Sequence, residues 1–261
     1  MASSKDSLVS RRNLLRLGAL TGLATALSPV LRLGKAHGAD TGAIPTPTPT
    51  PTPVFCNADR PTTPADALNA LIAGNQLWAT LNQVHPGEDA GRRTCVAENG
   101  QTPFAGIISC SDSRVPPELV FDQGIGDLFV ARVAGNGATG KLAESLYYGT
   151  AILGTLVIFV LGHSDCGAVK EAVAEYPKHP LEFVKLIFPA VKRARRMVKE
   201  SGGNPNDPTQ VVPIATNQNV ILTVQALRKS PLFKKMVSDG KLLIAGGVYD
   251  LNTQQVNILI Q

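Results

Sequence analysis

The sequence has few cysteines and little charge, and each shortage excludes a class of protein. Four cysteines in 261 residues are too few for a disulfide-knot scaffold, while 44% hydrophobic residues exclude disorder throughout. Residues 1–39 hold six of the 25 basic side chains and one of the 20 acidic ones, so residues 40–261 carry 19 of each sign. The body of the chain therefore has no net charge, and we expect no nucleic-acid partner. The length suits one large α/β domain or two small ones.

No apolar run is long enough for a comfortable membrane span, although residues 1–39 are typical of an export signal. Arg11 and Arg12 resemble a twin-arginine pattern, and the following apolar stretch over 17–31 is rich in Gly, Ala and Thr. Small residues near Ala36 and Ala39 offer cleavage points, so no stable span is expected after cleavage. This pattern predicts an extracytoplasmic location, in the periplasm or alternatively the thylakoid lumen. An amphipathic N-terminal helix is the competing interpretation.

A linker is expected over 40–62, followed by a catalytic domain over 63–261. From Pro45 to Pro53 threonine and proline alternate strictly, which predicts an extended spacer. Nine residues at about 3.1 Å each would span roughly 28 Å.

Helical and strand patterns alternate in the domain. We expect helices over 64–78, 141–153, 165–175, 181–200, 220–228 and 232–238, and a short helix opening at Pro116. We expect strands over 104–109, 128–133, 155–161, 241–248 and 255–260. Because these strands are almost wholly apolar and are joined by helices, they predict an α/β fold with a mostly parallel sheet flanked by helices.

Two polar segments follow predicted strands and contain cysteine or histidine. Cys110 opens the first segment, and His163 and Cys166 lie in the second. Loops at the carboxyl ends of parallel strands converge on one crevice, so these side chains can meet there. Two thiolates and one imidazole suit Zn²⁺ and leave one coordination position open. Buried structural cysteines and a Cys110–Cys166 disulfide are the alternatives.

The order and spacing of these segments resemble the β-class carbonic anhydrases. The similarity covers roughly residues 68–256 and includes LIAGN (71–75), CSDSRVPPE (110–118), DLFVARVAGN (127–136), HSDCGAV (163–169) and GGVYD (246–250). The resemblance implies a zinc lyase that interconverts carbon dioxide and bicarbonate, with one Zn²⁺ per subunit. It also implies a homodimer or tetramer whose active site lies near a subunit boundary.

The resemblance assigns roles to individual positions. Cys110, His163 and Cys166 match the zinc ligands, and Asp112 and Arg114 match a catalytic carboxylate–guanidinium dyad. Substrate-binding positions are matched by Gln101, Phe129, Ala134, Tyr148 and Gly167. Two positions depart from some relatives: Ala134 replaces a larger valine, and Ile107 replaces the tryptophan of a non-catalytic bicarbonate site.

The implied reaction is attack on carbon dioxide by a zinc-bound hydroxide that the Asp112–Arg114 dyad orients. Asp112 has an alternative place as a fourth zinc ligand in a closed site, and Arg114 is expected to hold it away from the metal. Two thiolates cancel the charge of the ion, which predicts an alkaline-leaning activity profile. The alternative functions are hydrolysis of carbonyl sulfide or carbon disulfide at the same site, or zinc binding without turnover.

The remaining cysteines, Cys56 and Cys95, lie outside these motifs and 39 residues apart. In an exported protein they could form a disulfide that ties the end of the linker to the domain. Two unpaired thiols are the alternative.

Overall fold

A computed structural model describes residues 55–138 and 140–261, so the predicted export signal and most of the predicted linker lie outside the described residues. The strands are β1 (Ala105–Ser109), β2 (Leu128–Arg132), β3 (Val157–His163), β4 (Leu243–Tyr249) and β5 (Val256–Ile260). The helices are α1 (Pro64–Ala79), α2 (Ala90–Asn99), α3 (Pro117–Val120), α4 (Gly140–Ala151), α5 (Gly167–Glu175), α6 (Glu182–Lys185), α7 (Phe188–Glu200), α8 (Pro208–Lys229) and α9 (Lys234–Ser238).

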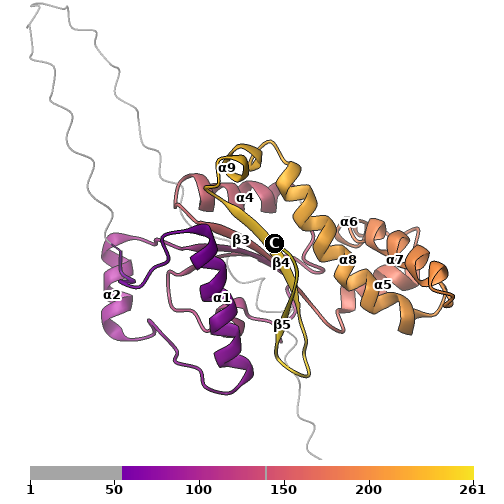
Figure 1. The fold of residues 1–261 in the computed structure, drawn as a ribbon, viewed down its shortest axis with the longest axis horizontal. Helices are drawn as coiled ribbons and strands as arrows, with labels where there is room; N and C mark the ends of the chain where they lie inside the picture. Colours follow the sequence, from indigo (N-terminus) through magenta and orange to yellow (C-terminus); the bar gives the residue numbers. More distant parts are fainter. Residues whose placement is uncertain (1–54, 139) are drawn as a thin grey trace, which may run out of the picture. The chain divides into compact units, whose positions relative to one another are not determined.

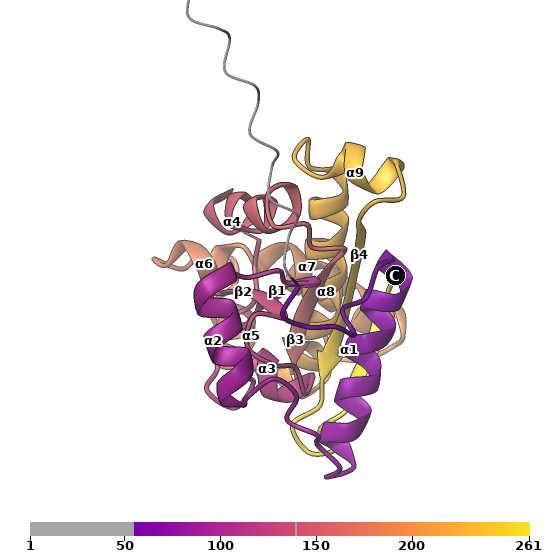
Figure 2. The ribbon, with the colours of Figure 1, turned by 90° about the vertical axis from the view of Figure 1, so that its left-hand side faces the viewer.

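The strands form one sheet in the order β2-β1-β3-β4-β5, in which the first four are parallel and β5 runs antiparallel to β4 (Figures 1 and 2). Every residue of β1 and β3 is buried, as expected for central strands covered on both faces. The described part of the chain thus confirms the predicted α/β fold with a mostly parallel sheet.

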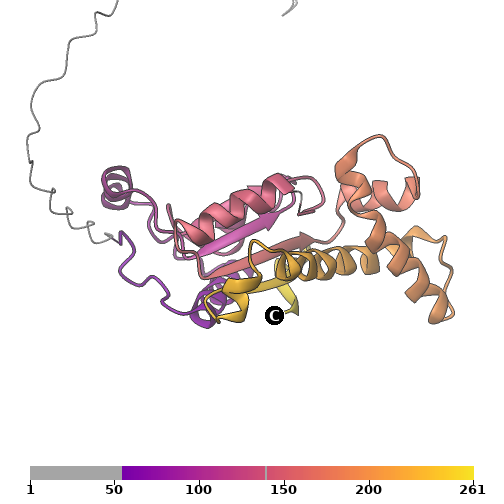
Figure 3. The same ribbon diagram turned by 90° about the horizontal axis from the view of Figure 1, so that it is seen from above.

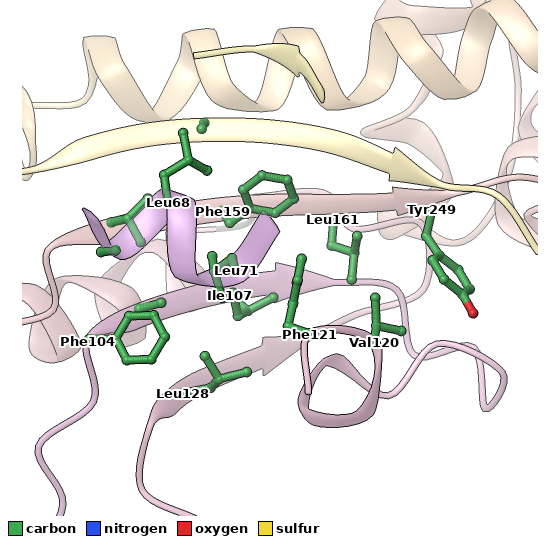
Figure 4. Packing of buried hydrophobic residues seen from close by; sticks show 14 of the residues in the cluster. Leu68, Leu71, Phe104, Ile107, Val120, Phe121, Leu128, Phe159, Leu161 and Tyr249 are labelled. Atoms are coloured by element: carbon green, nitrogen blue, oxygen red, sulfur yellow. The ribbon is translucent and has the colours of Figure 1, made fainter. Parts of the chain in front are cut away.

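Helices cover the two faces of the sheet with separate apolar clusters. On one face Leu68 and Leu71 of α1 pack against Ile107 and Phe159, and Phe121 meets the Phe159 ring edge-on with centroids 5.4 Å apart (Figure 4). On the other face the alternate residues of the strands contact α4 and α8. Helices α1 and α4 therefore lie on opposite sides of the strands (Figures 1 and 2).

A third apolar cluster lies beyond the carboxyl ends of the strands. Helices α5, α6, α7 and the first half of α8 gather there (Figure 3), and the cluster includes Cys110 and Cys166. Helix α2 lies at the opposite end of the sheet (Figures 1 and 3). The carboxyl ends of the strands thus carry the two cysteines of the predicted site, whereas the amino-terminal ends carry α2 (Figure 1).

Several elements differ from the sequence-based expectations. Helix α2 was not predicted, and the helix expected over 181–200 is divided into α6 and α7, with Pro189 in the first turn of α7. Helix α8 begins at Pro208, well before the expected residue 220, and includes Pro213 in its interior. Among the described residues, no helix combines the length and apolarity that a membrane crossing requires.

Cys56 and Cys95 form a disulfide in the structure. The last residues of the predicted linker are thereby attached to α2 rather than free of the domain.

Candidate metal centre

Three buried ligand side chains meet at the carboxyl ends of β1 and β3. Cys110 directly follows β1, His163 is the last residue of β3, and Cys166 is the N-cap residue of α5. Because β1 and β3 are parallel neighbours, both strands deliver their following residues to the same edge. The Sγ atoms of the two cysteines and a ring nitrogen of His163 all lie within 4.8 Å of one another.

The donor atoms of this cluster fit a zinc ion. His163 Nδ1 lies 2.9 Å from the Ser164 carbonyl oxygen, so Nδ1 carries the proton, and Nε2 is a free acceptor. Nε2 is buried and has no hydrogen-bond partner. The two sulfurs lie 3.9 Å apart. An orphaned imidazole nitrogen beside two thiols is the set of donors that a structural or catalytic Zn²⁺ site uses.

Ionisation of the two thiols is coupled. A hydrogen bond from the Cys166 thiol, together with one from the Gly135 amide, lowers the pKa of Cys110 below that of an ordinary thiol. Cys166 donates that hydrogen bond and is buried, which raises its own pKa. Two thiolates at this separation repel one another, so the fully ionised pair needs a cation between the sulfurs.

Asp112 and Arg114 form a bidentate ion pair beside the ligands. Arg114 Nε and Nη2 donate to the two carboxylate oxygens over 2.9 and 2.8 Å, and the Arg114 amide donates to Oδ1 over 3.0 Å. These donors hold the pKa of Asp112 well below its usual range, so the carboxylate is ionised. Its Oδ2 lies 3.7 Å from His163 Nε2. The predicted dyad is therefore assembled next to the metal ligands, with both carboxylate oxygens engaged by Arg114.

Other residues support the ligand loop and were missed by the sequence-based prediction. Arg132, at the end of β2, donates to the carbonyl oxygens of Cys110 and Asp112 over 2.9 and 2.6 Å. The Gly135 amide donates to Cys110 Sγ over 3.3 Å, and buried Asn219 of α8 donates to the Gly135 carbonyl over 2.8 Å. Arg132 and Gly135 stand inside the DLFVARVAGN motif, which was the available signal, whereas Asn219 had none.

Only some of the predicted substrate positions lie near the triad. Ala134 precedes Gly135, whose amide contacts the Cys110 sulfur, and Gly167 follows Cys166 at the start of α5. Phe129 and Tyr148 lie together, with ring centroids 6.1 Å apart. However, Phe129 pairs with Gly106, four residues before Cys110, which is about 13 Å back along the strand.

Gln101 lies at the other end of β1 from the triad of its own chain. It precedes β1, whereas Cys110 follows that strand. Gln101, Phe129 and Tyr148 are therefore displaced toward the amino-terminal edge of the sheet, away from the carboxyl ends that carry the ligands.

Known proteins match this chain over most of the domain. The family model described as carbonic anhydrase matches residues 105–256. Carbonic anhydrase 2 of Mycobacterium tuberculosis is 33% identical over 198 residues, which are 73% of this chain and 90% of that protein. A carbonic anhydrase of Synechococcus elongatus is 33% identical over 168 residues, 60% of each chain.

Solved structures give the same assignment. The β-carbonic anhydrase CcaA has a TM-score of 0.56 at 26% identity and covers 74% of this chain and 99% of its own. The Coccomyxa β-carbonic anhydrase in complex with acetazolamide has a TM-score of 0.53 at 27% identity, covering 74% of this chain and 86% of its own. Sequence, fold and metal centre agree: this chain belongs to the β-carbonic anhydrase family.

Proposed function

We propose that the chain catalyses the reversible hydration of carbon dioxide with Cys110, His163 and Cys166 as zinc ligands and Asp112 as the orienting carboxylate. The observation that carries this proposal is the buried ligand triad beside a carboxylate held by Arg114. When bound, zinc supplies a Lewis acid that lowers the pKa of water and so makes hydroxide available near neutral pH.

The protein side chains then place the reactants. Asp112 Oδ2, next to His163 Nε2, would accept a hydrogen bond from the attacking hydroxide. That hydrogen bond would direct a lone pair of the hydroxide oxygen at the carbon atom of carbon dioxide. Arg114 keeps the carboxylate from turning toward the metal because both of its oxygens are engaged. Ala134, next to the Gly135 amide that contacts the Cys110 sulfur, would add a small apolar side chain near the ligands, which suits an uncharged substrate.

The alternative functions have less support. Zinc storage or sensing needs no ionised carboxylate locked beside the ligands, yet Asp112 is held there by three hydrogen bonds from Arg114. Hydrolysis of carbonyl sulfide or carbon disulfide would use the same centre, but the matched relatives are carbonic anhydrases.

Asp112→Asn tests the proposed role directly. We expect the variant to keep one zinc per chain and to lose about 100-fold in kcat/KM, because asparagine has no charge and replaces one of the two acceptor oxygens with an NH2 donor. Stopped-flow hydration of carbon dioxide and metal analysis on the same sample provide the two readouts. Asp239→Asn, at an exposed site at the end of α9, is the matched control and should be unchanged. Wild-type turnover in Asp112→Asn would remove Asp112 from the reaction.

We further propose that two copies of the chain assemble so that each completes the other's pocket. Gln101, Phe129 and Tyr148 lie too far from their own ligand triad to contact a substrate there. Strand β2, which carries Phe129, is an edge strand of the described sheet, and Tyr148 is 49% exposed beside it. A dimer, alone or within a tetramer, would bring these side chains to a neighbouring centre.

Export before function is the third part of the proposal. The paired Arg11 and Arg12 ahead of a small-residue apolar stretch support twin-arginine export to the periplasm, or to a thylakoid lumen. The Cys56–Cys95 disulfide adds support, because such bonds persist in oxidising compartments.

A further inference from the structure

Helix α2, which leads directly to Gln101, is not fixed by hydrophobic packing. None of its apolar side chains is buried. Its attachments are the Cys56–Cys95 disulfide and an ion pair in which Arg92 Nη2 lies 3.4 Å from Asp127, with both side chains less than a tenth exposed. The helix ends at a C-cap glycine, Gly100, whose φ of 80° favours a residue without Cβ. The placement of Gln101, the next residue, therefore depends on how α2 is tied down.

The residues that follow Gln101 are gripped by Arg60. Arg60 Nε donates to the Thr102 carbonyl over 3.0 Å, and Nη2 donates to the Pro103 carbonyl over 3.1 Å. The same Nη2 reaches the Gly154 carbonyl, ahead of β3, over 2.8 Å. Besides its own neighbour, the Pro61 carbonyl, the guanidinium thus binds three carbonyl oxygens from two loops, which holds the Gln101 loop against the amino-terminal end of the strands.

A second polar contact anchors the segment that carries Cys56 and Arg60. Asn57 Nδ2 donates to Asp127 Oδ1 over 3.0 Å, the carboxylate that also pairs with Arg92. The backbone of Asp127 in turn accepts the Phe104 amide over 2.9 Å. Residues 56–60 and the loop 100–104 are therefore held to the same point of the domain.

Gln101 itself contributes nothing to its own placement. Its side chain is exposed and makes no hydrogen bond among the described residues. A flexible amide that must meet a substrate benefits when its backbone is fixed in advance, because less freedom is lost on binding.

We propose that Arg60 and the Cys56–Cys95 disulfide are positioning groups for Gln101: they hold the loop 100–103 so that its amide reaches the substrate pocket. This inference rests on the proposed function, in which Gln101 contacts substrate at a neighbouring centre. It makes the segment just after the Thr-Pro spacer part of the catalytic apparatus, and it makes full activity depend on an oxidised disulfide.

The first test compares Arg60→Met with Arg93→Met in the full chain. Methionine keeps an apolar stem and removes the guanidinium, and Arg93 is an exposed arginine of α2 that serves as the matched control. We expect Arg60→Met to lower kcat/KM about 2- to 10-fold, the effect of losing one neutral hydrogen bond to the substrate. Zinc content should stay at one per chain, because Arg60 lies at the amino-terminal ends of the strands and the ligands lie at their carboxyl ends. Arg93→Met should match the wild type.

A double-mutant cycle with Gln101→Ala separates positioning from general damage. If Arg60 acts through Gln101, Arg60→Met has no further effect on kcat/KM in the Gln101→Ala background. The same loss in both backgrounds, or no loss in either, would overturn the positioning role. Wild-type kcat/KM in Gln101→Ala alone would instead overturn the proposed role of Gln101, so the two failures are distinguishable.

The disulfide gives an independent measurement if Arg60→Met does not fold. Reduction of the wild-type chain with a phosphine should lower kcat/KM by a similar factor at unchanged zinc content. The Cys56→Ser/Cys95→Ser chain should show the lowered value already and should not respond to the phosphine. Equal activity of the oxidised and reduced wild-type chains would contradict the proposal.

Discussion

At the scale of single residues, the Cys110 sulfur is held by a relay that begins in a distant helix. Asn219 of α8 fixes the Gly135 carbonyl, and the Gly135 amide donates to Sγ. An amide directed at a thiolate stabilises its negative charge and fixes its lone pairs. Asn219 is thus a positioning residue for a zinc ligand.

Asn219→Ala should weaken zinc binding. The substitution leaves the buried Gly135 carbonyl without its donor, and loss of such supporting contacts typically costs about 10- to 100-fold in metal affinity. Competition with a chromophoric chelator measures that affinity. The control is Asn217→Ala, which changes an exposed residue two positions earlier on α8 and should leave zinc affinity unchanged. Equal affinity of the two variants would show that the relay to Cys110 has no effect on the metal.

The ligands were predictable residue by residue, whereas their supports were not. Cys110, His163 and Cys166 belong to short segments that directly follow strands, so their meeting follows from the topology of a parallel sheet. Asn219 reaches Gly135 across 84 positions of the chain, and no local pattern marks such a contact.

At the scale of elements, the errors in the prediction have identifiable physical causes. Helix α2 buries no apolar residue, so it lacks the apolar periodicity by which helices are recognised. Its ends were marked nonetheless, by Asp89, whose side chain accepts from the Arg92 amide, and by Gly100. The capping residues indicate the bounds of α2, although the hydrophobic pattern does not indicate a helix there.

Prolines mark two places where the helices differ from the prediction. Pro189 stands in the first turn of α7, where its missing N–H costs nothing, and so marks a new helix within 181–200. Pro213 lies inside α8, where a proline removes one backbone hydrogen bond and disfavours the helix. Packing of Val211 and Ala215 into the cluster around Cys166 outweighs that local penalty.

At the scale of the whole molecule, the separation of the pocket residues predicts an obligatory assembly. Ile152 follows α4, one helical turn after Tyr148, and is 68% exposed. Such an exposed isoleucine suits a contact with a second copy of the chain. Ile152→Asp should shift the mass measured by light scattering toward a monomer, lower kcat/KM more than about 10-fold and leave zinc content unchanged. Leu181→Asp, at an exposed apolar site at the other end of the molecule, is the control. A wild-type chain that is monomeric and fully active would contradict the shared pocket.

Export of the whole chain is proposed to depend on Arg11 and Arg12. Replacing Arg11 and Arg12 by lysine should keep the protein in the compartment of synthesis, because the paired guanidiniums are the signal that the twin-arginine pathway reads. Cell fractionation of a bacterial host with an intact pathway measures the distribution. Unchanged export of the double-lysine chain would show that another route is used.

Zinc K-edge X-ray absorption on the purified full chain shows whether Cys110, His163 and Cys166 together bind one zinc ion. We expect two sulfur ligands at about 2.3 Å and one imidazole nitrogen at about 2.0–2.1 Å. A zinc shell made only of nitrogen and oxygen atoms would contradict it.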